Sequence, residues 1–122
     1  MIYFKKFLYI DNIQQLNLDY IKKTKAKIIL RDSGGIDIKN YEKFVSQCNS
    51  RRIDIAAYND IKILFKFKLK YLYVSSYNKK PFKYLKKIKN RLKIVGSAHN
   101  KIEINEKIKQ GCDEIIVSRL FK

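Results

Sequence analysis

Residues 93–118 read KIVGSAHNKIEINEKIKQGCDEIIVS, and this stretch decides the fold. The apolar runs at 93–97 and 113–118 have the length of buried strands, and the residues between them have the pattern of a helix. A strand, a helix and a second strand joined by short connections form a right-handed crossover with parallel strands. The stretch therefore predicts one unit of an α/β fold.

The helix inside this unit has recognisable ends. Asn100 is a good N-cap, and Glu103, three residues later, resembles part of a capping box. Gly111 is placed to end the helix in a left-handed conformation. Ile104 and Ile108 lie four residues apart, so we expect both on the buried side of the helix.

The same alternation extends back to the N-terminus. Four more strands and four more helices are predicted, and Pro81 opens the last of these helices because proline suits a first helical turn. The strands are 6–10, 27–31, 53–58 and 71–75, and the helices are 12–24, 37–50, 60–67 and the one that begins at Pro81.

Three of these helices show an apolar face. The clearest is 37–50, where Asp37 can cap the start and the apolar residues recur at helical spacing. Its predicted face is Tyr41, Phe44, Val45 and Cys48. The other predicted faces are Ile13, Leu16 and Tyr20 in helix 12–24, and Phe82, Leu85, Ile88 and Leu92 after Pro81.

The predicted order contains six strands and five helices in a single domain, residues 1–122. Two architectures fit this order, an open doubly wound sheet and a (β/α) barrel. A complete eight-stranded barrel takes about 250 residues. The chain has 122 residues, so six strands would make only part of a barrel.

The chain is strongly basic, with 28 Lys and Arg against 11 Asp and Glu and a formal net charge of +17. Such a charge attracts nucleic acids and anionic membranes. Abundant Lys, Ile, Asn and Tyr are also what AT-rich codons produce, and the lysines are spread along the whole chain. Nucleic-acid binding is therefore an alternative that the composition does not favour.

The two cysteines, Cys48 and Cys112, form no CxxC pair, and no histidine cluster accompanies them. A zinc site is not expected, and free thiols in a reducing cytoplasm are the simplest interpretation. We expect neither a signal peptide nor a membrane span, because no apolar run is long enough for a span.

Polar residues follow the predicted strands, at the carboxyl ends where parallel α/β folds carry their chemistry. Arg31 could clamp a phosphate with two hydrogen bonds, and Asp60 with Asn59 could hold Mg²⁺, which prefers oxygen ligands. Ser97, close to the start of the next helix, could receive an anion. The remaining candidates at this edge are Asp11, Asn12, Asp32, Ser33, Ser75, Ser76, Asn78, His99, Asn100, Ser118 and Arg119.

These residues also have structural explanations. Asp60 could cap the helix that begins there, and Arg31 could pair with Asp32 or with a loop. His99, the only histidine, could be a loop residue rather than a general base. The chain has no P-loop, GxGxxG or nucleophile-elbow motif, so both kinds of explanation stay open.

Taken together, the motifs resemble those of the thiamine-phosphate synthase superfamily, which includes the thiazole tautomerases. Residues 93–121 resemble its fifth strand, its Ser-x-His turn, the following helix and the sixth strand. ILRD at 29–32 resembles the family's QLRDK, and YND at 58–60 resembles its IND. The family is a (β/α)8 barrel, so the resemblance implies a partial TIM barrel of about six strands and five helices.

The synthase joins hydroxymethylpyrimidine pyrophosphate to a thiazole phosphate, using Mg²⁺, and releases pyrophosphate. Carried over by position, the resemblance implies a small-molecule phosphate ligand and a cytoplasmic protein of thiamine biosynthesis. It implies pyrophosphate contacts from Arg31, Asn59 and Ser97, and a Mg²⁺ site at Asp60 and Asn78. His99 stands where the family has the histidine of its Ser-x-His turn.

The sequence departs from the family at several of these positions. Ile29 replaces the family's glutamine, Ser33 a lysine, and Asn78 the second metal-binding aspartate, while Ser118 and Arg119 replace a Gly-Pro turn. The chain also ends before the family's Thr-rich loop, its catalytic lysine and strands seven and eight. We therefore expect a shortened barrel whose activity is reduced or lost.

A shortened barrel would leave its first and sixth strands as open edges, whose unpaired backbone groups invite a second chain. Three alternatives stay open: a homodimer paired edge to edge, an open sheet, or a fragment of a longer reading frame. The alternative function is a non-catalytic basic protein that contacts nucleic acid or a protein partner.

Overall fold

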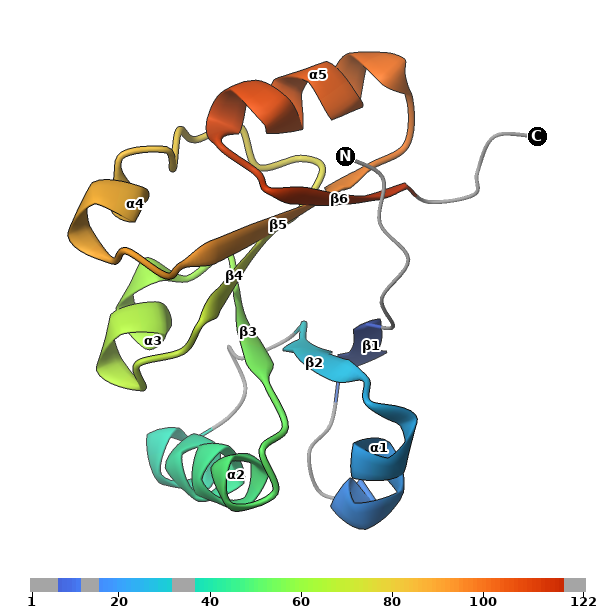
Figure 1. Ribbon diagram of the computed structural model, residues 1–122, viewed down its shortest axis with the longest axis vertical. Coiled ribbons are helices and arrows are strands. Elements are labelled where there is room, and N and C mark those ends of the chain that lie inside the picture. Colours follow the sequence, from blue (N-terminus) through green and yellow to red (C-terminus); the bar gives the residue numbers. More distant parts are fainter. Residues whose placement is uncertain (1–6, 12–15, 32–36, 118–122) are drawn as a thin grey trace.

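The computed structural model describes residues 7–11, 16–31 and 37–117 (Figure 1). Predictions for Asn12, Ile13, Asp32, Ser33, Ser118 and Arg119 lie outside these residues. The described strands are β1 (Phe7–Ile10), β2 (Lys27–Leu30), β3 (Ile55–Tyr58), β4 (Tyr71–Val74), β5 (Lys93–Ala98) and β6 (Glu114–Val117). The described helices are α1 (Leu18–Thr24), α2 (Ile38–Ser50), α3 (Ile61–Lys66), α4 (Leu85–Ile88) and α5 (Lys101–Gln110).

The strands form one parallel sheet in chain order, from β1 to β6. The sheet curls into a half-barrel, and the helices lie along its outer side (Figure 1). An open doubly wound sheet would instead carry helices on both faces and reverse its strand order. The predicted partial TIM barrel is therefore confirmed.

The sheet has an apolar layer on each face because successive strand residues point to opposite sides. The outer layer, between sheet and helices, is the larger and includes the buried residues Ile28, Leu72, Ile94, Phe44 and Leu64. The buried residues of the inner face are Ile29, Ala56, Tyr73 and Val95. Neither strand face is left polar, as expected for a parallel sheet.

Both cysteines are free thiols, as predicted. Cys48 is buried in the outer layer, and Cys112 packs against that layer. Burial raises the pKa of Cys48 to about 12 and that of Cys112 to about 11, so both stay protonated at neutral pH.

The helix ends confirm the predicted capping residues. The side chains of Asp37, Asp60 and Asn100 each accept a hydrogen bond from a backbone N–H in the first turn of α2, α3 and α5. Asn17 does the same for α1. Gly111 ends α5 with a φ of 102°, a conformation in which a Cβ is strained. Within the described residues, no helix is long and apolar enough to cross a membrane.

The predicted apolar faces are confirmed for α2 and corrected for α1. Every predicted residue of α2 is buried, namely Tyr41, Phe44, Val45 and Cys48. In α1, capping by Asn17 starts the helix at Leu18, and the buried residues are Leu18 and Ile21. Tyr20 points away from that pair and is 65% exposed, so its predicted burial was wrong.

The helix predicted to open at Pro81 begins four residues later, at Leu85. The segment before it contacts Gln110 of α5, whose side-chain amide donates to the Lys80 carbonyl and whose backbone carbonyl accepts from the Phe82 N–H. These bonds hold the chain after Pro81 against α5. Three predicted core residues are buried, namely Phe82, Leu85 and Leu92. Ile88 is 65% exposed, which corrects the prediction.

The buried side of α5 was also predicted wrongly. Ile108 is 51% exposed, and Ile104 is only partly buried. The buried residues of this helix are Lys107 and Gln110. Polar carbonyls of the neighbouring loop face α5, so the helix turns hydrogen-bond donors toward them rather than apolar carbon.

Candidate functional site

The carboxyl ends of the strands gather the predicted site residues along one edge of the sheet. We call this edge the rim and define it by Arg31, Asn59, Ser75, Asn78 and Ser97. The first three follow β2, β3 and β4, Asn78 lies in the loop after β4, and Ser97 lies near the end of β5. All strands are parallel, so their ends meet at the same side of the half-barrel.

Asn59, Ser75 and Asn78 form one hydrogen-bonded group, here called the amide cluster. The Asn59 side chain donates to Ser75 Oγ at 2.9 Å and accepts from the Ser75 N–H at 3.0 Å. Asn78 Nδ2 donates to Asn59 Oδ1 at 3.0 Å. Asn59 has a φ of 55°, a left-handed conformation that asparagine tolerates better than most residues. The amide cluster joins the ends of β3 and β4.

The oxygens predicted to bind Mg²⁺ are engaged by N–H donors. Asp60 Oδ1 accepts from the Ile63 N–H at 3.1 Å, and Asn78 Oδ1 accepts from the Lys80 N–H at 3.0 Å. Among the described residues, no group of three or more His, Cys, Asp or Glu could hold a metal ion. Mg²⁺ prefers several oxygen ligands in octahedral geometry. The arrangement therefore fits the capping explanation for Asp60, and Mg²⁺ binding by Asp60 and Asn78 stays a prediction.

Arg31 is paired with Asp11, the first residue after β1. Its Nε and Nη2 donate to the two carboxylate oxygens at 3.1 and 3.0 Å, and this pairing raises the Arg31 pKa. The side chain remains 48% exposed, so the pair stands in water. Surface ion pairs of this kind contribute little to stability. A phosphate at Arg31 would compete with Asp11 for the guanidinium.

Ser97 and His99 occupy different surroundings at the end of β5. Ser97 lies opposite Ile116 in the register with β6. The His99 N–H donates to Glu103 Oε1 at 2.7 Å, and His99 Nδ1 lies 3.0 Å from the same oxygen. These contacts lower the pKa of Glu103 and tie His99 to the first turn of α5. Glu103 thus completes the predicted cap through His99 rather than through Asn100.

Tyrosine side chains of the inner face pack against one another next to the rim. The Tyr58 and Tyr73 rings stack with centroids 5.2 Å apart, and Tyr9 meets Tyr73 edge-on at 5.7 Å. The Arg31 guanidinium lies 5.5 Å from the centre of the Tyr9 ring. The Tyr58 hydroxyl lies 3.2 Å from that of Tyr77, and burial raises the Tyr58 pKa to about 12. Burial also raises the Tyr9 pKa, so the hydroxyls of Tyr9 and Tyr58 are neutral at neutral pH.

Comparison with known proteins finds a match in structure and none in sequence. No protein-family model and no curated protein sequence matches the chain. A thiamine phosphate pyrophosphorylase from Pyrococcus furiosus matches in structure, with a TM-score of 0.70 and 14% sequence identity. The match covers 96% of this chain and 61% of that protein. The two chains share a fold.

The prediction missed Lys107 and Gln110, which connect α5 to the rim. Lys107 Nζ and Gln110 Nε2 each donate to the Asn78 carbonyl at 2.7 Å. Asn78 belongs to the amide cluster, so the rim is held from the outer side of the sheet. The pattern of α5 gave no sign of this, because polar residues are normally assigned to the solvent side of a helix.

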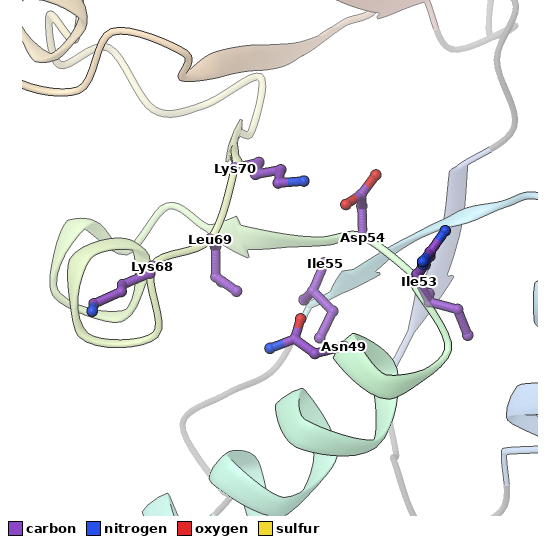
Figure 2. A pocket seen from close by; sticks show the side chains of 8 residues that line it. Asn49, Ile53, Asp54, Ile55, Lys68, Leu69 and Lys70 are labelled. Carbon is purple, nitrogen blue, oxygen red and sulfur yellow. The ribbon is translucent and has the colours of Figure 1, made fainter.

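A hollow lies at the opposite end of the sheet (Figure 2). Several of its side chains are basic, but they do not point toward one common position. It has a volume of about 470 Å³ and is lined by Asn49, Arg52, Ile53, Asp54, Ile55, Lys68, Leu69 and Lys70. Lys70 points toward Asp54, whereas Lys68 points away from both (Figure 2). This end of a parallel barrel usually serves stability rather than chemistry. The rim is therefore the better candidate site.

Proposed function

We propose that the chain is a thiamine-phosphate-synthase-like protein that binds the phosphate or pyrophosphate group of a small molecule at its rim. One observation carries the proposal, namely that Arg31, Asn59 and Ser97 lie at the carboxyl ends of β2, β3 and β5 in a fold shared with a thiamine phosphate pyrophosphorylase. The sequence resemblance assigns pyrophosphate contacts to the same three residues.

The proposed contacts differ in kind. Arg31 supplies the positive charge and a planar guanidinium that suits a phosphate. Ser97 supplies a hydroxyl, and Asn59 supplies amide groups held in place by Ser75 and Asn78. Asp60 is the one carboxylate of the predicted metal pair, and its Oδ1 caps α3. We therefore propose that the synthase reaction, which depends on Mg²⁺ in the family, is reduced or lost while phosphate binding is kept.

Calorimetric titration of thiamine phosphate, with Mg²⁺ and pyrophosphate present, tests the proposal. We expect saturable binding that Arg31→Ala weakens by about tenfold or more, the usual effect of losing a hydrogen bond to a charged group. Asp11→Asn should strengthen binding because it removes the carboxylate that competes for Arg31. Arg52→Ala, at the opposite end of the sheet, is the matched control and should bind as the wild type does.

Two outcomes count against the proposal. A folded wild type that gives no heat has no such site, and an Arg31→Ala variant that binds unchanged places the ligand elsewhere.

Titration with RNA addresses the alternative of a basic binding protein, since binding of a polyanion weakens steeply as salt is raised. Pairing of two copies through β1 or β6 predicts a dimer by light scattering.

A further inference from the structure

The most unusual group in the described part of the chain is the buried side chain of Lys107. The residue has 0% exposure, although lysine is almost never fully buried without a charged partner. Its Nζ donates to two neutral acceptors, the Asn78 carbonyl and Gln110 Oε1, both at 2.7 Å. Burial lowers the Lys107 pKa, as desolvation disfavours an ammonium ion.

The sheet leaves room for this lysine. A Cβ built on Gly96 of β5 would lie 3.0 Å from Lys107 Cδ and 2.6 Å from Cys112 Sγ. Protein interiors are close-packed, so any residue larger than glycine would displace one of these side chains. Gly96 has no positive φ that would require glycine for the backbone. Its small size instead leaves space for Cys112 Sγ and for the stem of Lys107.

Lys107 and Gln110 together hold the loop between β4 and α4. Gln110 Nε2 donates to the carbonyls of Asn78 and Lys80, both at 2.7 Å, and the Phe82 N–H returns a bond to the Gln110 carbonyl. The loop is thus attached to α5 at three successive points. Asn78 extends the connection by donating from its side chain to Asn59 in the amide cluster.

We infer that Lys107 is a positioning residue of the rim. It fixes the Asn78 backbone from behind the sheet, and Asn78 in turn orients the Asn59 amide that the proposed function assigns to the phosphate. The inference rests on the proposed function for its consequence in ligand binding. The mechanical part of the inference rests only on the contacts from Lys107 to Asn78 and from Asn78 to Asn59.

Amide hydrogen exchange of the Lys107→Met variant tests the inference without any ligand. Methionine keeps the length of the stem and removes the donor. The amide protons of Ser75 and Asn78, which bond to Asn59 Oδ1 and to the Ser75 carbonyl, should exchange about tenfold faster, as expected for one lost charge-assisted bond. Exchange at Ile28, in β2 and two strands away from β4, should not change. Lys109→Met, on the exposed side of α5, is the matched control.

Two further measurements make the result decisive. A uniform rise of exchange across the sheet in Lys107→Met would show a role in global stability alone and would overturn the inference, as would no change at Ser75 and Asn78. If Lys107→Met does not fold, Gln110→Met must show the same local pattern, because it removes the second donor to the Asn78 carbonyl.

Ligand binding separates the two proposals. Where the wild type binds thiamine phosphate, Lys107→Met should weaken binding severalfold and Lys109→Met should not. Unchanged affinity in Lys107→Met would overturn the positioning role. If the wild type binds nothing, the proposed function fails, and the exchange pattern alone decides whether Lys107 fixes the loop.

Discussion

Helices α2 and α5 have 13 and 10 residues, yet they bury opposite kinds of side chain. α2 packs Tyr41, Phe44, Val45 and Cys48 against the sheet. α5 buries Lys107 and Gln110 and leaves Ile102 and Ile108 in water. The two helices therefore have different roles. α2 packs apolar side chains into the core, whereas the buried side of α5 forms hydrogen bonds with the loop that borders the rim.

The largest expected effect is in α2. Phe44→Ala should lower the free energy of unfolding by about 3–5 kcal/mol, because it removes a large buried side chain and leaves a cavity. The equivalent change on α5, Ile108→Ala, should stay within about 0.5 kcal/mol because that side chain is half exposed. Urea unfolding followed by circular dichroism measures both. Equal losses in the two helices would contradict the comparison.

The next effect concerns the space that β5 leaves for α5. Gly96→Ala should cost about 1–3 kcal/mol through overpacking against Lys107 and Cys112. The cost should shrink in the Lys107→Ala background, where the lysine stem is gone, and a double-mutant cycle measures that difference. A Gly96→Ala cost that does not depend on Lys107 would mean that the overpacking is against Cys112, the closer neighbour, and not against the lysine stem.

A smaller effect concerns the helix starts, which α2 and α5 share. Asp37→Ala and Asn100→Ala should each cost about 1 kcal/mol, because each side chain accepts a backbone N–H of the first turn. Thermal unfolding of the two variants measures both. A much larger loss for Asn100→Ala would show that this side chain does more than cap α5.

The contrast between the two helices also explains how far the sequence could predict the fold. Strand and helix order, the parallel sheet and the caps followed from local patterns, since apolar periodicity and capping residues act over a few neighbours. The barrel, as against an open doubly wound sheet, was implied only by the family resemblance. The face of α2 followed for the same reason. The face of α5 did not, because the groups that draw Lys107 and Gln110 inward are carbonyls from a loop about 30 residues earlier in the chain.

The position of the candidate site could be predicted from the sequence, but the hydrogen-bond partners of its side chains could not. Parallel strands guarantee that Arg31, Asn59 and Ser97 share one edge. That Arg31 pairs with Asp11 depends on how β1 and β2 end side by side, and that Asn59 and Asn78 bond to each other depends on the loop after β4. The space for the Lys107 side chain depends on Gly96 of a different element, because a Cβ there would lie 3.0 Å from Lys107 Cδ.

The smallest expected effect is a change of the free energy of unfolding with pH. It should come from Lys107 of α5 rather than from the apolar face of α2. The folded state lowers the Lys107 pKa below its ordinary value of 10.5. As the pH rises through the folded pKa toward 10.5, the unfolded chain holds the extra proton, so stability should rise. The stability of wild type relative to Lys107→Met should therefore increase with pH.

Unfolding in urea at several pH values between neutral and 9 measures this difference. Cys112 and Tyr58 have raised pKa values, about 11 and 12, so the stability that they contribute is lost as the pH passes their ordinary values of 9.0 and 10.0, mainly above the range compared. Lys109→Met should follow the wild type at every pH. A stability difference between wild type and Lys107→Met that stays flat with pH would mean that the folded state does not perturb the pKa of this lysine.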